Sequence, residues 1–232
     1  MQILLTGGSG LLGTEILKLG TKMLAPSRRE LDIRDASAVA AYIADVVPGI
    51  ILHAAAATNN RNIEADPTAA LDVNINGTAN IARACLGSKI RLVYVSTDYV
   101  YKGDRGNYAE TDELLPSNIY AWTKLAGEAA VRAVPDHLII RTSFGASRFD
   151  YPQAFTDKWS SKDYVDRIAP KILKATTGTV RGVLNIGGPR RTIYDYAVER
   201  NPDVSKATLS DASLDSPVDT SLNLDKWESL DD

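Results

Sequence analysis

Tyr120 and Lys124 are the two side chains of this sequence whose types and spacing best suit acid-base chemistry. They lie four residues apart in the stretch YAWTK, inside a predicted helix, so both side chains share one face, a turn apart. A phenol releases its proton reluctantly at neutral pH, whereas a neighbouring ammonium favours the phenolate and prepares it for proton transfer. The same spacing also arises by chance on ordinary amphipathic helices, so the surroundings of the pair must decide.

Thr97 and Asp98 lie where a partner for this pair is expected, directly after a predicted buried strand in the stretch VSTD. In an open sheet of parallel strands, ligands bind at the carboxyl ends of the strands. Thr97 is therefore placed to hydrogen-bond the same substrate oxygen as Tyr120. We take Thr97, Tyr120 and Lys124 as the candidate catalytic set.

A glycine pattern at the first predicted strand-to-helix turn indicates a dinucleotide-binding loop. Gly7, Gly10 and Gly13 lie between a strand at 2–6 and the helix that follows. Gly7 permits a tight turn, Gly10 lets the backbone approach a pyrophosphate, and Gly13 allows close packing of helix on strand. The helix N-terminus favours phosphate oxygens. A merely tight loop is the alternative.

The residues after the second predicted strand indicate which dinucleotide binds. An acidic residue there would accept the ribose hydroxyls, but this chain has Ser27, Arg28 and Arg29. A hydroxyl and two guanidiniums suit a 2'-phosphate, so the sequence favours NADPH, with NADH possible. Two solvated surface arginines are the alternative. Asp32, in the same stretch, is a candidate for adenine contact.

Three alanines at the end of the third predicted strand, Ala54, Ala55 and Ala56, are small enough to let a nicotinamide approach the backbone. Close packing alone explains them almost as well. His53 precedes them without an identifiable partner, so we expect it to be structural.

Short apolar runs alternate with helical patterns along the first 143 residues, which predicts an α/β fold: a Rossmann-like, doubly wound parallel sheet covered by helices on both faces. The predicted strands are 2–6, 22–26, 50–57, 91–98 and 137–143, and the predicted helices are 7–20, 35–49, 67–87 and 117–134.

The pattern becomes irregular after Ser143, and the segment 144–166 is expected to face the substrate. Beyond it we expect a helix at 167–178 despite its Pro170, a strand at 182–188, and helices at 192–200 and 224–230. In the last segment an apolar set is expected to cover one face of the sheet: Leu222, Leu224, Trp227 and Leu230. Residues 1–143 thus form a dinucleotide-binding core, and 144–232 a small substrate-binding portion interleaved with it.

The overall composition excludes several classes of protein. With 232 residues and a net charge of −3, the chain lacks the excess of Lys and Arg that nucleic-acid binding requires. Its single cysteine, Cys85, cannot form an internal disulfide and is expected to be buried and inert. No stretch approaches the roughly 20 apolar residues of a membrane span. We expect a cytoplasmic protein without membrane or nucleic-acid partners.

The glycine triplet, STDYVY and YAWTK, together with RRELDIRD, HAAAAT and IIRTS, resemble the extended branch of the short-chain dehydrogenase/reductase superfamily. Within that branch they are similar to the dTDP-4-dehydrorhamnose reductase family. The resemblance is strong over residues 1–143 and looser in VLNIGGPRRTIYDYA and SPVDTSLNLDKWESL.

This resemblance implies reduction of the 4-keto group of a nucleotide-activated 6-deoxyhexose. Tyr120 would donate the proton, Lys124 would hold the nicotinamide ribose and lower the pKa of the tyrosine, and Thr97 would orient the carbonyl. It further implies cofactor contacts at Leu11, Leu12 and Ile33, and substrate contacts at Asp98, Tyr99, Thr142, Ser143 and Phe144. A homodimer is possible, and no metal site carries over.

The chain departs from this family after RTS, where it is shorter and has Phe144 in place of the usual tryptophan. Lys158, Trp159 and Ser160 are candidates for a replacement pocket, with Trp159 as a core filler the equal alternative. Two other functions stay open: an epimerase or dehydratase that keeps NAD tightly bound, and a non-catalytic NADP-binding regulatory subunit.

Overall fold

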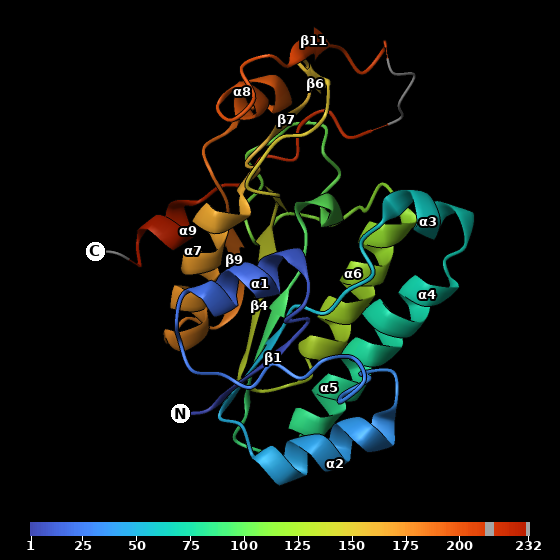
Figure 1. The fold of residues 1–232 in the computed structure, drawn as a ribbon, viewed down its shortest axis with the longest axis vertical. Coiled ribbons are helices and arrows are strands. Elements are labelled where there is room, and N and C mark those ends of the chain that lie inside the picture. The colour runs from blue at the N-terminus through green and yellow to red at the C-terminus, as the bar shows by residue number, and fades with distance from the viewer. Residues whose placement is uncertain (212–215, 231–232) are drawn as a thin grey trace.

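The central feature of the computed structural model, which describes residues 1–211 and 216–230, is a parallel sheet of five strands in the order β1-β2-β3-β4-β9 (Figure 1). The strands are β1 (Ile3–Thr6), β2 (Ile50–His53), β3 (Arg91–Val95), β4 (His137–Thr142) and β9 (Gly182–Ile186). All four strand pairings are parallel, so the carboxyl ends of the strands meet at one edge. The doubly wound α/β fold expected from the sequence is confirmed.

Helices cover both faces of this sheet. One face packs against α1 (Leu11–Lys18) and α7 (Val165–Thr177), and the other against α2 (Ala36–Val46), α5 (Thr78–Cys85) and α6 (Ile119–Val131). Alternate strand residues point to opposite faces, so Ile3 and Leu5 lie in the first core and Leu4 in the second. Apolar side chains on both faces explain why the strand sequences are continuously apolar.

The predicted second strand at 22–26 is reduced to a single parallel bridge between Leu24 and Leu4. The Leu24 amide donates to the Ile3 carbonyl at 2.8 Å, and its carbonyl accepts from the Leu5 amide at 2.7 Å. Pro26 has no amide hydrogen to continue the pairing. The segment still crosses beside β1, where the sequence placed it.

The predicted helix at 67–87 is built from three pieces: α4 (Thr68–Ala70), the π-helix η1 (Leu71–Gly77) and α5. Asn74 in the π-helical turn accepts from the Ala57 amide and donates to the Thr123 hydroxyl. The wide turn thus places a buried amide between the loop after β2 and helix α6. Helix α3 (Asn60–Ala65) and the 3-10 turn η2 (Asp98–Val100) were not predicted, and the strands expected at 50–57 and 91–98 end earlier, at His53 and Val95.

The C-terminal portion forms a small lobe above the carboxyl edge of the sheet (Figure 1). It holds short paired strands and a helix: β5 (Phe144–Gly145), β6 (Gln153–Phe155), β7 (Trp159–Ser160), β8 (Asp163–Tyr164), β10 (Arg191–Thr192), α8 (Ile193–Val198) and β11 (Ser205–Ala207). The lobe pairs β7 with β10, β6 with β11, and β5 with β8. Helix α7 packs on the central sheet, and strand β9 belongs to it. The division at residue 143 into a dinucleotide-binding core and an interleaved substrate-binding portion stays a prediction.

The final segment covers the sheet only in part. Trp227, in α9 (Asp225–Glu228), packs into the core beside α7, but Leu222 joins a separate cluster with Val100, Tyr101 and Tyr108. Leu224 packs against that second cluster, and Leu230 is exposed. The prediction of one apolar face formed by all four was wrong, because the bridge between Tyr108 and Leu222 turns the chain away from the sheet.

Cys85 is buried as expected, and burial raises the pKa of its thiol to about 12, which makes it unreactive. Within the described residues, no helix combines the length and apolar character that crossing a bilayer demands.

Candidate active site

The glycine turn between β1 and α1 has the geometry that its three glycines suggest. Gly7 has φ of +79°, and a Cβ there would lie 2.6 Å from the Ala55 amide nitrogen. A Cβ on Gly13 would overlap the Gly7 carbonyl oxygen. Gly10 is the N-cap of α1 and donates its amide to that carbonyl at 3.0 Å. Backbone amides and the helix N-terminus are therefore exposed at the carboxyl edge, where a phosphate group is stabilised.

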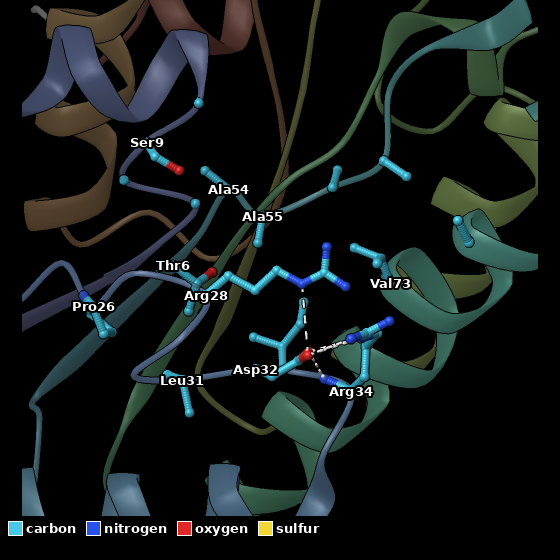
Figure 2. A pocket seen from close by; sticks show the side chains of 17 residues that line it. Thr6, Ser9, Pro26, Arg28, Leu31, Asp32, Arg34, Ala54, Ala55 and Val73 are labelled. Carbon is cyan, nitrogen blue, oxygen red and sulfur yellow. Dashed lines mark hydrogen bonds and ion pairs between the residues drawn. The ribbon is translucent and has the colours of Figure 1, made fainter. Parts of the chain in front are cut away.

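A first cavity of about 350 Å³ opens beside this turn (Figure 2). Most of the predicted cofactor residues line it: Gly7, Gly10, Arg28, Asp32, Ile33, Ala54, Ala55 and Ala56. Figure 2 shows Arg28 and Arg34 converging on the Asp32 carboxylate. Nε of Arg34 donates to Oδ1 of Asp32 at 2.9 Å, and this bond is the main reason the pKa of Asp32 lies well below its ordinary value.

Ser27 and Arg29 do not line this cavity, and their role in binding the cofactor stays a prediction. Both are exposed, and the Ser27 amide donates to the Glu30 carboxylate at 2.7 Å. Arg34 lines the cavity as a second guanidinium beside Arg28. Sequence reasoning missed it, although it stands in the same stretch RRELDIRD.

A second cavity of about 620 Å³ adjoins the first, since Gly7, Gly10, Ala54 and Ala56 line both. It brings together all of the predicted catalytic and substrate residues and the two leucines of the glycine turn: Thr97, Asp98, Tyr99, Tyr120, Lys124, Thr142, Ser143, Phe144, Leu11 and Leu12. Sequence reasoning missed Asn59, Asn60, Tyr151 and Lys162 in its lining.

Tyr120 stands in the first turn of α6, where the Asn118 side chain caps the helix by accepting from the Ala121 amide at 2.8 Å. Burial and the nearby Asp98 raise the pKa of Tyr120 above its ordinary value, while the Thr97 hydroxyl opposes the rise. Desolvation is the largest influence on the pKa of this phenol, and the lowering of that pKa by Lys124 stays a prediction. The phenol is therefore protonated at neutral pH, as a proton donor must be.

Lys124 is only 2% exposed, and its ammonium lies 4.0 Å from the centroid of the Tyr94 ring. Burial lowers the pKa of Lys124 to about 7, and the Glu128 carboxylate one turn further along α6 partly offsets this change. A buried ammonium that packs on a ring face has N–H groups that can donate hydrogen bonds to a ligand in the cavity.

This burial predicts a pH dependence of stability. The folded-state pKa of about 7 lies below the ordinary 10.5, so the unfolded chain binds more protons between these pH values. The free energy of unfolding therefore rises with pH between these values because of Lys124. This contribution of Lys124 is fully present above the unfolded-state pKa and is lost as the pH falls through about 7. Lys124→Met should remove this dependence while keeping the packing volume.

In denaturation with urea at a series of pH values, the stability of Lys124→Met relative to the wild type should decline from neutral to alkaline pH by at least about 1.4 kcal/mol, the equivalent of one pKa unit. A difference that stays constant across this range would contradict the assignment.

Asp98 is held by hydroxyl groups. It accepts from Thr220 at 2.6 Å, from Ser160 at 3.3 Å and from Thr97 at 3.2 Å. Burial raises the pKa of Asp98, while the hydroxyl bonds and the nearby Lys162 and Lys158 oppose the rise. Because Ser160 and Thr220 come from the C-terminal portion, Asp98 ties that portion to the end of β3.

The segment after β6 answers the open question about Lys158, Trp159 and Ser160. None of the three lines the second cavity. Lys158 donates to the Tyr99 hydroxyl at 3.2 Å, and Trp159 pairs with Thr192 in the β7–β10 ladder. Lys158 and Ser160 thus contact the cavity residues Tyr99 and Asp98 from outside the cavity.

His53 is structural, as expected. Its two ring nitrogens lie 2.6 Å from the Thr6 hydroxyl and 3.0 Å from the Thr78 hydroxyl. Burial and the charge of Lys124 lower the pKa of His53 to about 3, so the ring is neutral.

A buried ion pair that the sequence did not reveal lies behind Lys124. Glu128 accepts from Arg141 Nη2 at 2.8 Å and from the Ser96 hydroxyl at 2.6 Å. Arg141 in turn donates to the Tyr101 hydroxyl at 2.8 Å. The only sequence signal was the spacing of Glu128, one turn after Lys124 in YAWTKLAGE.

A parallel sheet with a glycine turn, and a threonine, tyrosine and lysine gathered in one cavity at its carboxyl edge, place the protein in the short-chain dehydrogenase/reductase class. The profile of the family described as "RmlD substrate binding domain" matches residues 1–179. The chain therefore belongs to this family.

Individual relatives agree with this assignment. The dTDP-4-dehydrorhamnose reductase of Mycobacterium tuberculosis (strain CDC 1551 / Oshkosh) is 32% identical over 207 residues, which cover 78% of this chain and 67% of the relative. Methionine adenosyltransferase 2 subunit beta of Rattus norvegicus is 33% identical over 141 residues, which cover 56% of this chain and 42% of the relative.

Among solved structures, the dTDP-4-dehydrorhamnose reductase of Bacillus anthracis str. Ames, in complex with NADP, superposes with a TM-score of 0.87 at 23% identity, covering 99% of this chain and 92% of that one. This likeness shows the shared fold over the described part of the chain.

Proposed function

We propose that the protein is an oxidoreductase that uses NADPH to reduce the 4-keto group of a nucleotide-activated 6-deoxyhexose. One observation carries the proposal: Thr97, Tyr120 and Lys124 line a single cavity that continues into the arginine-lined cavity at the glycine turn. A dinucleotide bound along both cavities would bring its reactive end next to the phenol.

The residues of the first cavity fit NADPH. Arg28 and Arg34 together outweigh the one carboxylate between them, Asp32, and so suit a phosphate better than a diol. The close approach of Gly7 to Ala55 leaves no room for larger side chains where the pyrophosphate would pass. NADPH supplies the hydride when it is bound. NADH stays possible, since the same turn serves either dinucleotide.

The residues of the second cavity would then act on the ketone. Tyr120 donates the phenolic proton to the oxygen that becomes the hydroxyl, and Thr97 donates a hydrogen bond to the same oxygen. Lys124 holds the nicotinamide ribose hydroxyls with its ammonium. Thr142 lines the cavity and is 3% exposed, and its buried hydroxyl has no hydrogen-bond partner in the described part of the chain, so the hydroxyl has a free hydrogen-bonding capacity.

The substrate class rests on the relative from Mycobacterium tuberculosis, which is named a dTDP-4-dehydrorhamnose reductase. We propose Asp98, Tyr99, Ser143 and Phe144 as contacts of the sugar, because they line the cavity beside Tyr120. A cytoplasmic location, the homodimer and the division at residue 143 remain parts of this proposal.

The two competing functions make different predictions. An epimerase or dehydratase would be isolated with NAD bound and would not consume added NADPH. A regulatory subunit is favoured by the similarity to methionine adenosyltransferase 2 subunit beta. It would bind NADPH without reducing any substrate, and Tyr120 would be dispensable for its effect.

The direct test measures NADPH oxidation with dTDP-4-keto-6-deoxyhexoses and with their UDP and GDP counterparts, each with and without a sugar epimerase. Consumption of NADPH with one of them, matched by formation of the reduced sugar, is the expected result. Tight binding of NADPH without consumption by any of these sugars would refute the reductase and leave the regulatory function.

The arginine pair predicts the choice of cofactor. Arg34→Ala removes one of the two guanidiniums and the closer partner of the Asp32 carboxylate, leaving Arg28 Nε at 3.7 Å, so that Asp32 repels a 2'-phosphate more strongly and can accept from ribose hydroxyls. The Kd for NADPH should rise about ten- to a hundredfold, as for loss of a hydrogen bond to a charged group, while the Kd for NADH changes little. Fluorescence titration with both cofactors measures this, and Arg29→Ala, outside the cavity, is the matched control. If Arg34→Ala weakened the binding of NADPH and NADH equally, Arg34 would have no role in recognising the 2'-phosphate.

A further inference from the structure

Lys162 is held in a fixed position at the second cavity. It lies between β7 and β8, where its amide donates to the Ser160 hydroxyl at 3.1 Å and its carbonyl accepts from Arg191 at 3.4 Å. Its aliphatic stem passes close to the backbone, since a Cβ on Gly145 would lie 3.1 Å from Cε of Lys162. The ammonium lies 5.9 Å from the centroid of the Tyr196 ring. The backbone of Lys162 is therefore held by hydrogen bonds, and its stem lies beside Gly145.

The ammonium of Lys162 has unused donors. Across residues 1–211 and 216–230, no hydrogen bond from its Nζ is present, and the residue lines the cavity together with Tyr99 and Tyr120. Asp98 attracts it electrostatically, but hydroxyl groups already bind both carboxylate oxygens. Lys158 differs, because its Nζ is engaged by the Tyr99 and Ser216 hydroxyls. Three donors facing a cavity indicate a ligand that brings acceptors.

The charges around the cavity favour an anionic acceptor. Lys124 and Lys162 both line it, and Asp98 is the carboxylate among its lining residues. Burial raises the pKa of Asp98, which weakens its negative charge, and burial lowers the pKa of Lys162 while Asp98 opposes that change. A negatively charged ligand beside Lys162 would restore the stability of its ammonium form.

We propose that Lys162 is a substrate-binding residue whose ammonium binds an anionic oxygen of the nucleotide sugar, either on the diphosphate or on a carboxylate carried by the sugar. The inference rests on the proposed function in one respect: it takes a nucleotide sugar as the occupant of the cavity. Lys162 would fix the substrate while Tyr120 and Thr97 act on its carbonyl.

The test compares the full-length wild type with Lys162→Met and Lys162→Arg by calorimetric titration in saturating NADP. Lys206→Met is the matched control, because Lys206 also lies near a tyrosine ring, with Nζ 5.2 Å from the Tyr194 centroid, but is exposed outside the cavity. The probes are dTDP, UDP-glucose and UDP-glucuronate. They separate a diphosphate contact from a contact with a sugar carboxylate.

If Lys162 binds the diphosphate, Lys162→Met should weaken all three probes about ten- to a hundredfold and reduce the salt dependence of binding, and Lys162→Arg should restore most of the affinity. If it binds a sugar carboxylate, the loss should be confined to UDP-glucuronate. Binding of every probe by Lys162→Met within twofold of the wild type and of Lys206→Met would overturn the proposal.

These outcomes separate the inference from the proposed function. If the wild type reduces a nucleotide sugar but the Lys162 variants bind the probes as well as the wild type does, this inference alone is refuted. Binding that depends on Lys162, without reduction of any nucleotide sugar, supports the anion site and refutes the reductase. If the wild type binds none of the probes, this inference fails, and the NADPH oxidation test alone decides the reductase.

Discussion

Tyr120→Phe should lower kcat for the keto sugar by about a thousandfold, because the variant keeps the ring but has no proton to donate. The raised pKa of Tyr120 keeps the phenol protonated at neutral pH, so the wild type enters each turnover with the proton in place. Binding of NADPH should change by less than about twofold, since the ring still fills the same space. Steady-state kinetics and a cofactor titration on the same preparation measure both quantities.

Tyr99→Phe is the matched control, since Tyr99 lines the same cavity and its hydroxyl accepts a hydrogen bond from Lys158 at 3.2 Å. It should reduce kcat by no more than about tenfold, the cost of one lost hydrogen bond. Equal losses in the two variants would mean that Tyr120 is only one more polar contact. Undiminished turnover in Tyr120→Phe would remove the proton donor from the mechanism altogether.

Much of the fold and of the site follows from local sequence signals. Continuous apolar runs such as IILH become central strands because both faces of the sheet are covered by helices. The glycine turn follows from steric needs at Gly7 and Gly13 that no other residue meets. Tyr120 and Lys124 follow from helical spacing, and Thr97 from its position after a strand.

The residues that were missed depend on contacts distant in sequence. Lys162 reaches the cavity only because β5 and β8 pair and carry it past Gly145. Asn74 acquires its role from a π-helical turn that bonds to Ala57 and Thr123, and no periodicity in the sequence reports it. Arg34 lines the first cavity beside Arg28 because its side chain bonds to Asp32 there. The positions of these side chains depend on tertiary packing, which cannot be read from a single sequence.

Arg141→Met should destabilise the protein by about 3–5 kcal/mol, because it leaves the Glu128 carboxylate buried without its guanidinium partner. Both residues are fully buried, and two hydrogen bonds from Arg141, at 2.8 and 3.1 Å, hold the carboxylate. For a chain of this length the loss corresponds to a fall in Tm of about 6–20 °C. Thermal and urea denaturation should agree on it.

The double variant Arg141→Met, Glu128→Leu distinguishes an unpaired charge from lost packing. It should recover most of the stability, since an apolar pair avoids the desolvation that the ion pair must offset. Activity should not recover with it. Glu128 also accepts from Ser96, next to Thr97, and its charge supports the ammonium form of Lys124. If the double variant is stable but has a low kcat, and if the pH dependence of its kcat is shifted to lower pH through Lys124, the buried pair serves the active site as well as the fold. If kcat recovers fully, the pair contributes to stability alone.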